Sequence, residues 1–202
     1  MKKIKLLILI LLFPVSCLSQ LRDSVYVKTD IYEVMYSEKH RQPLWVKYKL
    51  SCRGGKIPRK GLDFYINDSI KTSDNKDYEG NVWDKGHLAP AGNFNCDPVT
   101  LKTTFSYLNC ALQHETLNRG VWRSVESRER ELFKTHKDIW VLVQLDFSSF
   151  EKLPTGSSVP KGFHKNIYIN NILYESYYFL NKPPLTCDPK KFLLEKNKIN
   201  CE

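Results

Sequence analysis

The sequence lacks several features that would define its class at once. It contains six cysteines but no CxxC pair, so their spacing does not match a metal site built from paired cysteines. It shows no internal repeat, and no window is biased enough in composition to be disordered. The longest apolar run, residues 6–13, is too short to span a bilayer, and no other stretch is apolar enough. What remains is one folded domain in a chain of 202 residues, of which 42% are hydrophobic.

The first 20 residues are typical of an export signal rather than of a folded segment. Three lysines within residues 2–5 precede the apolar run of residues 6–13, which has the length of a signal-peptide core. Cleavage after Ser19 would give a soluble chain, whereas cleavage before Cys17 would give a lipoprotein with a lipid anchor. Pro14 occupies a place where a lipobox usually has leucine, so we favour the soluble product. We therefore expect a secreted or periplasmic protein.

The chain is basic. Its 31 lysines and arginines against 22 acidic residues give a formal net charge of +9, and removal of the three signal lysines leaves +6. A basic domain suits a polyanionic partner, because cations that neutralise phosphates release condensed counterions. Many exported proteins are basic without such a partner, so the charge alone favours nucleic acid only weakly.

The cysteines suit an exported protein, in which disulfides persist. Removal of Cys17 would leave five: Cys52, Cys96, Cys110, Cys187 and Cys201. At least one of the five is then unpaired. Cys187 with Cys201 is a reasonable pair, and Cys96 with Cys110 would clip the region of the candidate site. The sequence leaves the connectivity open.

The hydrophobic pattern predicts an alternation of strands with one long helix. Strands are predicted over residues 25–36, 44–50, 82–88, 103–108 and 139–147, and as a pair over residues 166–180. Asn170 and Asn171 favour a hairpin turn within that pair. The polar segment 51–81 is interpreted as a long ordered loop that shapes a substrate groove. Pro183 and Pro184 end the folded pattern, which assigns residues 1–19 to a signal peptide, 20–182 to a single domain and 183–202 to a surface tail.

The helix is predicted from about residue 117 to residue 134. Its apolar positions at helical spacing are Leu117, Val121, Val125 and Leu132. A neighbouring stripe steps by four residues and should share one face: Asn118, Trp122, Glu126 and Arg130.

His87 is the first candidate for chemistry. It lies in segment 84–91, which reads Asp-Lys-Gly-His-Leu-Ala-Pro-Ala, so glycine and proline tighten the loop around it. An unperturbed imidazole has a pKa near about 6.5 and is available as a base at neutral pH. A lone histidine is more often a structural residue at the end of a strand, but the surrounding segment favours the general base.

Asn118 and Glu126 are the candidate metal residues. Mg²⁺ prefers oxygen ligands and keeps several waters, so one amide oxygen can anchor it. A carboxylate two helical turns further on can hold those waters without touching the ion. Without His87, the two would be read as a helix cap and a solvated side chain. A base beside a hard-cation site is sufficient to hydrolyse a phosphodiester.

Four charged residues are expected to support this chemistry, each with an ordinary surface charge as the alternative. Asp84 would orient the loop or the water shell of the metal, and Lys85 would contact a phosphate. Arg59 and Arg130 would add positive charge near the substrate.

Three further residues are expected nearby. Asn109 and Gln113 bracket the start of the helix and should hydrogen-bond the loop backbone. Trp122 should pack in the core or as a wall under the site.

Segments 84–91 and 109–126 resemble, in their residues and in their order along the chain, the DNA/RNA non-specific endonucleases of the ββα-metal (His-Me finger) superfamily. The resemblance extends from about residue 31 to about residue 180. It implies an α+β domain with a mixed, largely antiparallel sheet, packed helices and a ββα-metal site.

Carried over residue by residue, the resemblance implies that His87 is the general base and Asn118 the direct metal ligand. Glu126 would act on the metal through water, and Lys85 would replace the usual arginine. Asn109, Gln113 and Arg130 match positions that support the site.

The implied reaction is cleavage of DNA and RNA that depends on Mg²⁺, Mn²⁺ or another divalent ion and leaves 5′-phosphate ends. Binding would be through the phosphate backbone, with little sequence preference. Three departures affect rate more than reaction type: Lys85 lacks the fork of a guanidinium, Leu112 replaces a common proline, and residues 144–147 lack a usual Gly-Pro. The alternatives are a catalytically weak nucleic-acid-binding relative and an exported binding module with no nucleic-acid role.

Overall fold

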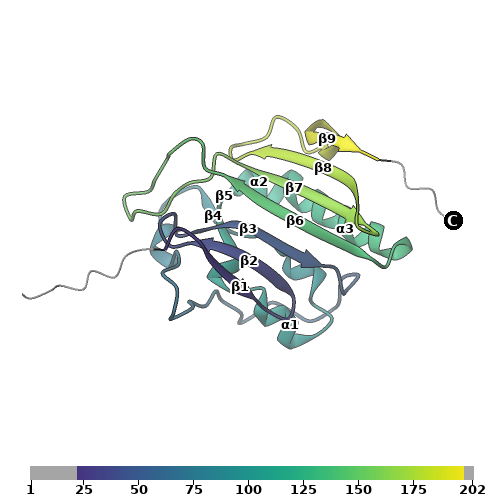
Figure 1. The fold of residues 1–202 in the computed structure, drawn as a ribbon, viewed down its shortest axis with the longest axis horizontal. Helices are drawn as coiled ribbons and strands as arrows, with labels where there is room; N and C mark the ends of the chain where they lie inside the picture. Colours follow the sequence, from purple (N-terminus) through teal and green to yellow (C-terminus); the bar gives the residue numbers. More distant parts are fainter. Residues whose placement is uncertain (1–21, 198–202) are drawn as a thin grey trace, which may run out of the picture.

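The structure, a computed structural model, describes residues 22–197 (Figure 1). Its strands are β1 (Val25–Lys28), β2 (Tyr32–Ser37), β3 (Gln42–Lys49), β4 (Trp83–His87), β5 (Cys110–His114), β6 (Ile139–Asp146), β7 (Gly162–Ile169), β8 (Ile172–Leu180) and β9 (Leu193–Lys196). Its α-helices are α1 (Pro98–Thr103), α2 (Glu115–Leu117) and α3 (Arg123–Thr135), and a π-helical turn, η4 (Asn118–Trp122), joins the last two. Short 3-10 turns are η1 (Asn75–Asp77), η2 (Ala91–Asn93), η3 (Tyr107–Asn109) and η5 (Pro189–Phe192). No helix within these residues is both long enough and apolar enough to cross a membrane.

The strands form two antiparallel sheets. The larger has the order β1-β2-β3-β6-β7-β8-β9, and β4 pairs with β5 in a separate two-stranded ribbon. Helix α3 lies across one face of the large sheet (Figure 1). This arrangement confirms the α+β fold with a largely antiparallel sheet and packed helices.

The core forms where α3 and η4 meet the large sheet. Alternate residues of the central strands point to this face, so Val46, Val143 and Ile167 are fully buried. They belong to the same cluster as Val121 and Val125, the apolar stripe of the helix. Burial of both surfaces fixes the helix on the sheet, and that in turn places its polar face near the β4–β5 ribbon.

The predicted helix over residues 117–134 forms, but it is not continuous. It includes η4, in which Gly120 has non-helical backbone angles of φ −101° and ψ −114°. The predicted strand over residues 25–36 is two strands, because the Thr29 side chain accepts hydrogen bonds from the amides of Ile31 and Tyr32 and closes a turn.

The predicted strand over residues 103–108 was wrong. These residues contain the end of α1 and the turn η3, where the Ser106 hydroxyl accepts a hydrogen bond from the Leu108 amide. The strand that pairs with β4 begins at Cys110 instead. The apolar side chains of this segment are buried by the turn. Over so short a stretch, their spacing resembles the period-two pattern of a strand.

The hairpin prediction at Asn170 and Asn171 was correct. Both residues have positive φ, 50° and 64°, as the tight turn between β7 and β8 requires. The folded pattern does not end at Pro183 and Pro184, however. The chain returns as β9, which pairs with β8 and adds a seventh strand to the sheet. The predicted signal peptide, residues 1–19, lies outside the described residues.

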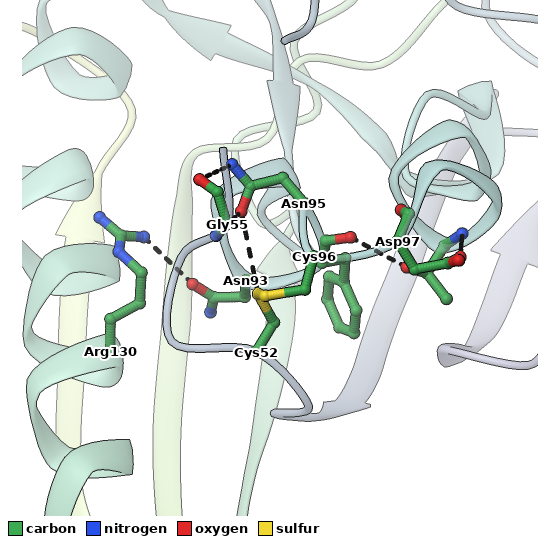
Figure 2. The surroundings of a disulfide bond; sticks show 9 residues. Cys52, Gly55, Asn93, Asn95, Cys96, Asp97 and Arg130 are labelled. Atoms are coloured by element: carbon green, nitrogen blue, oxygen red, sulfur yellow. Dashed lines mark hydrogen bonds between the residues drawn. A yellow bond between two sulfur atoms is a disulfide. The ribbon is translucent and has the colours of Figure 1, made fainter. Parts of the chain in front are cut away.

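One disulfide, Cys52–Cys96, occurs within residues 22–197 and ties the long loop 51–81 to the segment before α1 (Figure 2). This pairing rules out the suggested bond between Cys96 and Cys110, and Cys110 is a buried thiol. Cys187 is exposed, and its suggested partner Cys201 lies outside the described residues.

The loop 51–81 also contacts the segment before α1 through its backbone. Asn95 exchanges hydrogen bonds with the amide and the carbonyl of Gly55 (Figure 2). A Cβ atom at Gly55 would lie 2.0 Å from the Asn95 carbonyl oxygen, so only glycine permits this approach. The loop is therefore ordered, as predicted from its length and composition.

A buried ion pair joins α3 to the sheet. Lys165 Nζ on β7 lies 2.6 Å from Glu129 Oε1 on α3, and both side chains are 0% exposed. The ammonium also lies 4.3 Å from the centroid of the Trp122 ring. The other carboxylate oxygen of Glu129 accepts hydrogen bonds from Tyr48 (2.9 Å) and Asn93 (2.6 Å).

We predict that Lys165→Met destabilises the fold by about 3–5 kcal/mol, because it leaves the Glu129 carboxylate buried without its counter-ion. The double variant Glu129→Gln/Lys165→Met removes both charges and should recover most of that loss. Urea unfolding followed by circular dichroism measures the free energy of unfolding.

The matched control is Lys49→Met. Lys49 pairs with Asp138 at the same 2.6 Å, but the lysine side chain is 67% exposed. Its loss should cost less than about 1 kcal/mol. Equal effects of Lys165→Met and Lys49→Met would contradict the role given to the buried pair.

Candidate active site

The candidate site lies where the β4–β5 ribbon meets the helix. Strand β4 ends at His87, which stands opposite Cys110 at the start of β5. Strand β5 runs directly into α2 and η4, so Asn118 follows the ribbon after one helical turn. Two strands and a helix thus bring segments 84–91 and 118–130 together.

A hollow of about 500 Å³ opens between these elements. Five residues singled out from the sequence line it: Arg59, His87, Asn118, Glu126 and Arg130. Two arginines that the sequence interpretation missed, Arg119 and Arg123, complete its basic wall. Both lie on the predicted helix that carries Asn118, four residues apart, and this spacing is the sequence signal that would have identified them.

His87 has an environment that keeps its imidazole neutral. Its ring packs against the rings of Phe64 and Phe105, with centroid distances of 4.7 Å and 4.8 Å. Burial, together with the positive charge of Arg59, lowers the pKa of His87 to about 3. Nε2 is buried and has no hydrogen-bond partner in residues 22–197. Since His87 also lines the hollow, its other nitrogen, Nδ1, is the one available to accept a proton there.

The orientation of Asn118 follows from its contact with Asp84. Asn118 Nδ2 donates a 2.9 Å hydrogen bond to Asp84 Oδ2. A carboxylate only accepts, so the amide nitrogen must face Asp84 and the amide oxygen is left for another partner. Arg119 donates two hydrogen bonds to the same carboxylate, of 2.9 Å and 2.6 Å, and also forms an ion pair with Glu115 at 3.0 Å.

Glu126 stands on α3 at the wall of the hollow. Burial raises its pKa to about 7, against the opposing charges of Lys165 and Arg130. Within residues 22–197, no group of three or more His, Cys, Asp or Glu side chains is arranged to hold a metal. The oxygen donors at the hollow are one amide and one carboxylate. That small donor set fits Mg²⁺, which retains most of its waters, better than a cation that needs a full protein cage.

Arg130 and Arg59 approach the hollow from different elements. Arg130 donates to Asn93 Oδ1 at 3.1 Å and to Ser127 Oγ at 2.9 Å, so its partners are neutral (Figure 2). Arg59 comes from the disulfide-tied loop and lies beside Gly92. The long loop therefore contributes a cation to the site, in keeping with the predicted role in shaping a groove.

Lys85 and Trp122 lie outside the hollow lining. Lys85 Nζ is 3.1 Å from Asp63 Oδ1 and also donates to Asn75. A phosphate contact by Lys85 would require it to exchange these partners for the substrate. Trp122 is fully buried and packs edge-on against Phe163 at 5.5 Å, so it belongs to the core.

Asn109 and Gln113 lie under the loop that carries His87. Asn109 receives a 2.7 Å hydrogen bond from the Ala89 amide and donates to the carbonyls of Ala89 and Thr104. Gln113 is on β5 rather than at a helix start, and a Cβ atom at Gly86 would lie 2.5 Å from its Oε1. Its buried amide has no hydrogen-bond partner within residues 22–197. Gln113 therefore contacts the loop by packing, not by hydrogen bonds.

Comparisons with known proteins identify the family of the chain. The sequence profile for DNA/RNA non-specific endonucleases matches residues 12–192. Mitochondrial Endonuclease G of Bos taurus is 33% identical over 115 residues, which cover 54% of this chain and 38% of that protein. Mitochondrial Nuclease EXOG of Danio rerio is 34% identical over 112 residues, which cover 53% of this chain and 33% of that protein. The chain thus spans less than half the length of these two relatives.

A fungal relative and a solved structure cover more of the chain. Nuclease C1 of Cunninghamella echinulata is 24% identical over 189 residues, 80% of this chain and 75% of that protein. A chain in the crystal structure of the EndoG/EndoGI complex has a TM-score of 0.74 and 25% identity, and the match covers 84% of this chain and 80% of that one. The profile match over most of the sequence, with the ribbon and helix that it leads one to expect, shows that this chain belongs to the DNA/RNA non-specific endonuclease family.

Proposed function

We propose that this protein hydrolyses phosphodiester bonds in both DNA and RNA, with a divalent cation, ordinarily Mg²⁺, and little preference for sequence. The observation that carries the proposal is a single hollow that His87, Asn118, Glu126 and four arginines line together. A base, an oxygen-donor site and phosphate-binding cations are the three components that such hydrolysis needs.

His87 acts as the general base. Its lowered pKa keeps the imidazole unprotonated at neutral pH, so Nδ1 can take a proton from the attacking water. Phe64 and Phe105 hold the ring in place, which limits the reorganisation needed when the water arrives.

Asn118 would hold the cation through its amide oxygen, and Asp84 fixes that amide by accepting from its nitrogen. Glu126, on the next part of the helix, would act on the cation through water. The bound cation would supply positive charge that offsets the charge developing on the phosphate and on the leaving oxygen. The alternative is a catalytically weak relative that binds nucleic acid. A digestion assay separates the two, because the weak relative would cleave poorly.

Arg59 and Arg130 bind the phosphate backbone. Contacts to phosphate carry no information about the base sequence, so the proposed specificity is low. The assay is digestion of supercoiled plasmid DNA and of RNA, with Mg²⁺ and with excess EDTA. Cleavage of both substrates that stops in EDTA supports the proposal, and unchanged substrates in Mg²⁺ would overturn it.

We predict that His87→Ala lowers the cleavage rate by about 10²–10⁴-fold, because the positioned base is lost. Far-ultraviolet circular dichroism should show the wild-type fold. A variant that keeps more than half of the wild-type rate would rule out His87 as the base.

Asn118→Ala should weaken the affinity for Mg²⁺ and leave the fold unchanged. The Mg²⁺ concentration for half-maximal rate should rise, and excess Mg²⁺ should restore part of the activity. Asp84→Asn should shift that Mg²⁺ concentration by about 10–100-fold, because Asp84 orients Asn118 and is itself held by Arg119. A wild-type Mg²⁺ titration for Asn118→Ala would exclude that residue as the ligand.

We infer that the chain is exported, on the basis of the lysines and apolar run that precede residue 20. Mass spectrometry of protein recovered from medium and periplasm should find an N-terminus at Gln20. A diacylated Cys17 in the membrane fraction would show the lipoprotein instead, and an intact Met1 in the cytoplasm would refute export.

A further inference from the structure

A second hollow adjoins the first. It has a volume of about 310 Å³ and is lined by Arg119, Gly120, Arg123, Ser124, Ser127 and Cys187. Arg119 and Arg123 line both hollows, so they form the wall between them. Among residues 22–197, no carboxylate lines the second hollow, whereas Glu126 lines the first. A polyanion that occupies the first hollow can therefore continue into the second without meeting a negative charge.

The two shared arginines differ in their partners. Arg119 is held by Asp84 and Glu115, with an ion pair to each. Arg123 is exposed, and within residues 22–197 its guanidinium makes no ion pair and no side-chain hydrogen bond. Two carboxylates largely neutralise Arg119, so Arg123 supplies the uncompensated cation at the boundary.

The floor of the second hollow is polar and open. Ser124 and Ser127 donate their hydroxyl protons to the carbonyls of Gly120 and Arg123, at 3.4 Å and 3.1 Å. Gly120 has no side chain, and a Cβ atom there would lie 3.8 Å from Cys187 Sγ on the opposite wall. The hollow thus combines a free guanidinium, which can donate to phosphate oxygens, with two hydroxyl oxygens that can still accept from sugar hydroxyls.

We propose that the second hollow is a subsite for the backbone of a nucleotide next to the scissile phosphate, with Arg123 as its phosphate-binding residue. This inference rests on the proposed nuclease function. Arg123 then determines how strongly a polynucleotide is bound, while His87 and Asn118 act on the bond that is cleaved.

The first test is binding without cleavage. Affinity of the wild-type protein, Arg123→Ala and Arg123→Lys for a fluorescent single-stranded DNA is measured in EDTA by anisotropy, over a range of salt concentrations. Arg123→Ala should bind about tenfold more weakly, as expected for one charge-assisted hydrogen bond. The slope of log affinity against log salt should fall by about one, and Arg123→Lys should retain most of the slope.

The matched control is Lys137→Ala. Lys137 is exposed beyond the far end of α3 and also carries one positive charge. If the effect of Arg123 were only a contribution to net charge, the two alanine variants would shift the affinity and the slope equally. That result would overturn the subsite.

The second test compares two variants of Ser124 that differ in charge but hardly in shape. Ser124→Asp and Ser124→Asn are nearly isosteric, and the aspartate should raise KM for a long oligonucleotide several-fold more than the asparagine. The same aspartate should affect a short chromogenic phosphodiester less, because that substrate does not extend into the second hollow. Equal KM values for the two Ser124 variants would overturn the proposal.

Binding and cleavage by the wild-type protein show whether the nuclease function or only the subsite has failed. A wild-type protein that neither binds nor cleaves nucleic acid refutes the nuclease function itself. A wild-type protein that cleaves, with Arg123→Ala and Lys137→Ala indistinguishable from each other, refutes only the subsite.

Discussion

The buried ion pair between Glu129 and Lys165 is the constraint on which the rest of the site depends. The charged atoms are 2.6 Å apart and neither side chain is exposed, so a shift of α3 along β7 would leave buried charges without their partners. The same carboxylate accepts hydrogen bonds from Tyr48 on β3 and from Asn93, in the loop that follows His87. One residue of α3 thus fixes the helix relative both to the sheet and to the loop that carries the proposed base.

The loop after His87 is held from several directions, which explains how a base on irregular backbone keeps its position. Asn109 bonds both polar backbone groups of Ala89, and Asn93 receives a further bond from Arg130 (Figure 2). The Cys52–Cys96 disulfide ties the neighbouring segment to the loop that carries Arg59. These contacts join the loop that follows His87, and the loop that carries Arg59, to neighbouring parts of the structure, so small movements of either loop would break several bonds at once.

The sequence alone was sufficient to predict the features that depend on residues close together in the chain. The helix over residues 117–134, the Asn170–Asn171 turn and the family motif were all predicted from short windows, and the structure has the fold and the family that they indicated. Features that depend on distant contacts were not predicted. Strand β9 is only four residues long and forms because β8 offers an edge, and Glu129 meets Lys165 only once α3 lies on the sheet. The error at residues 103–108 has the same origin, since tertiary contacts bury a turn there as thoroughly as a strand.

The distribution of paired charge explains why net charge was a weak guide to function. A total of +9 does not distinguish arginines that are neutralised by carboxylates from those that are not. Arg119 and Arg128 form ion pairs with Asp84 and Glu175 and serve the fold. Around the hollows, the described residues give Arg59, Arg123 and Arg130 no carboxylate within ion-pair distance; Arg130 has only the neutral partners Asn93 and Ser127. Cations held by neutral groups keep their attraction for phosphate, so the unpaired arginines, rather than the total charge, mark the surface where a nucleic-acid backbone should bind.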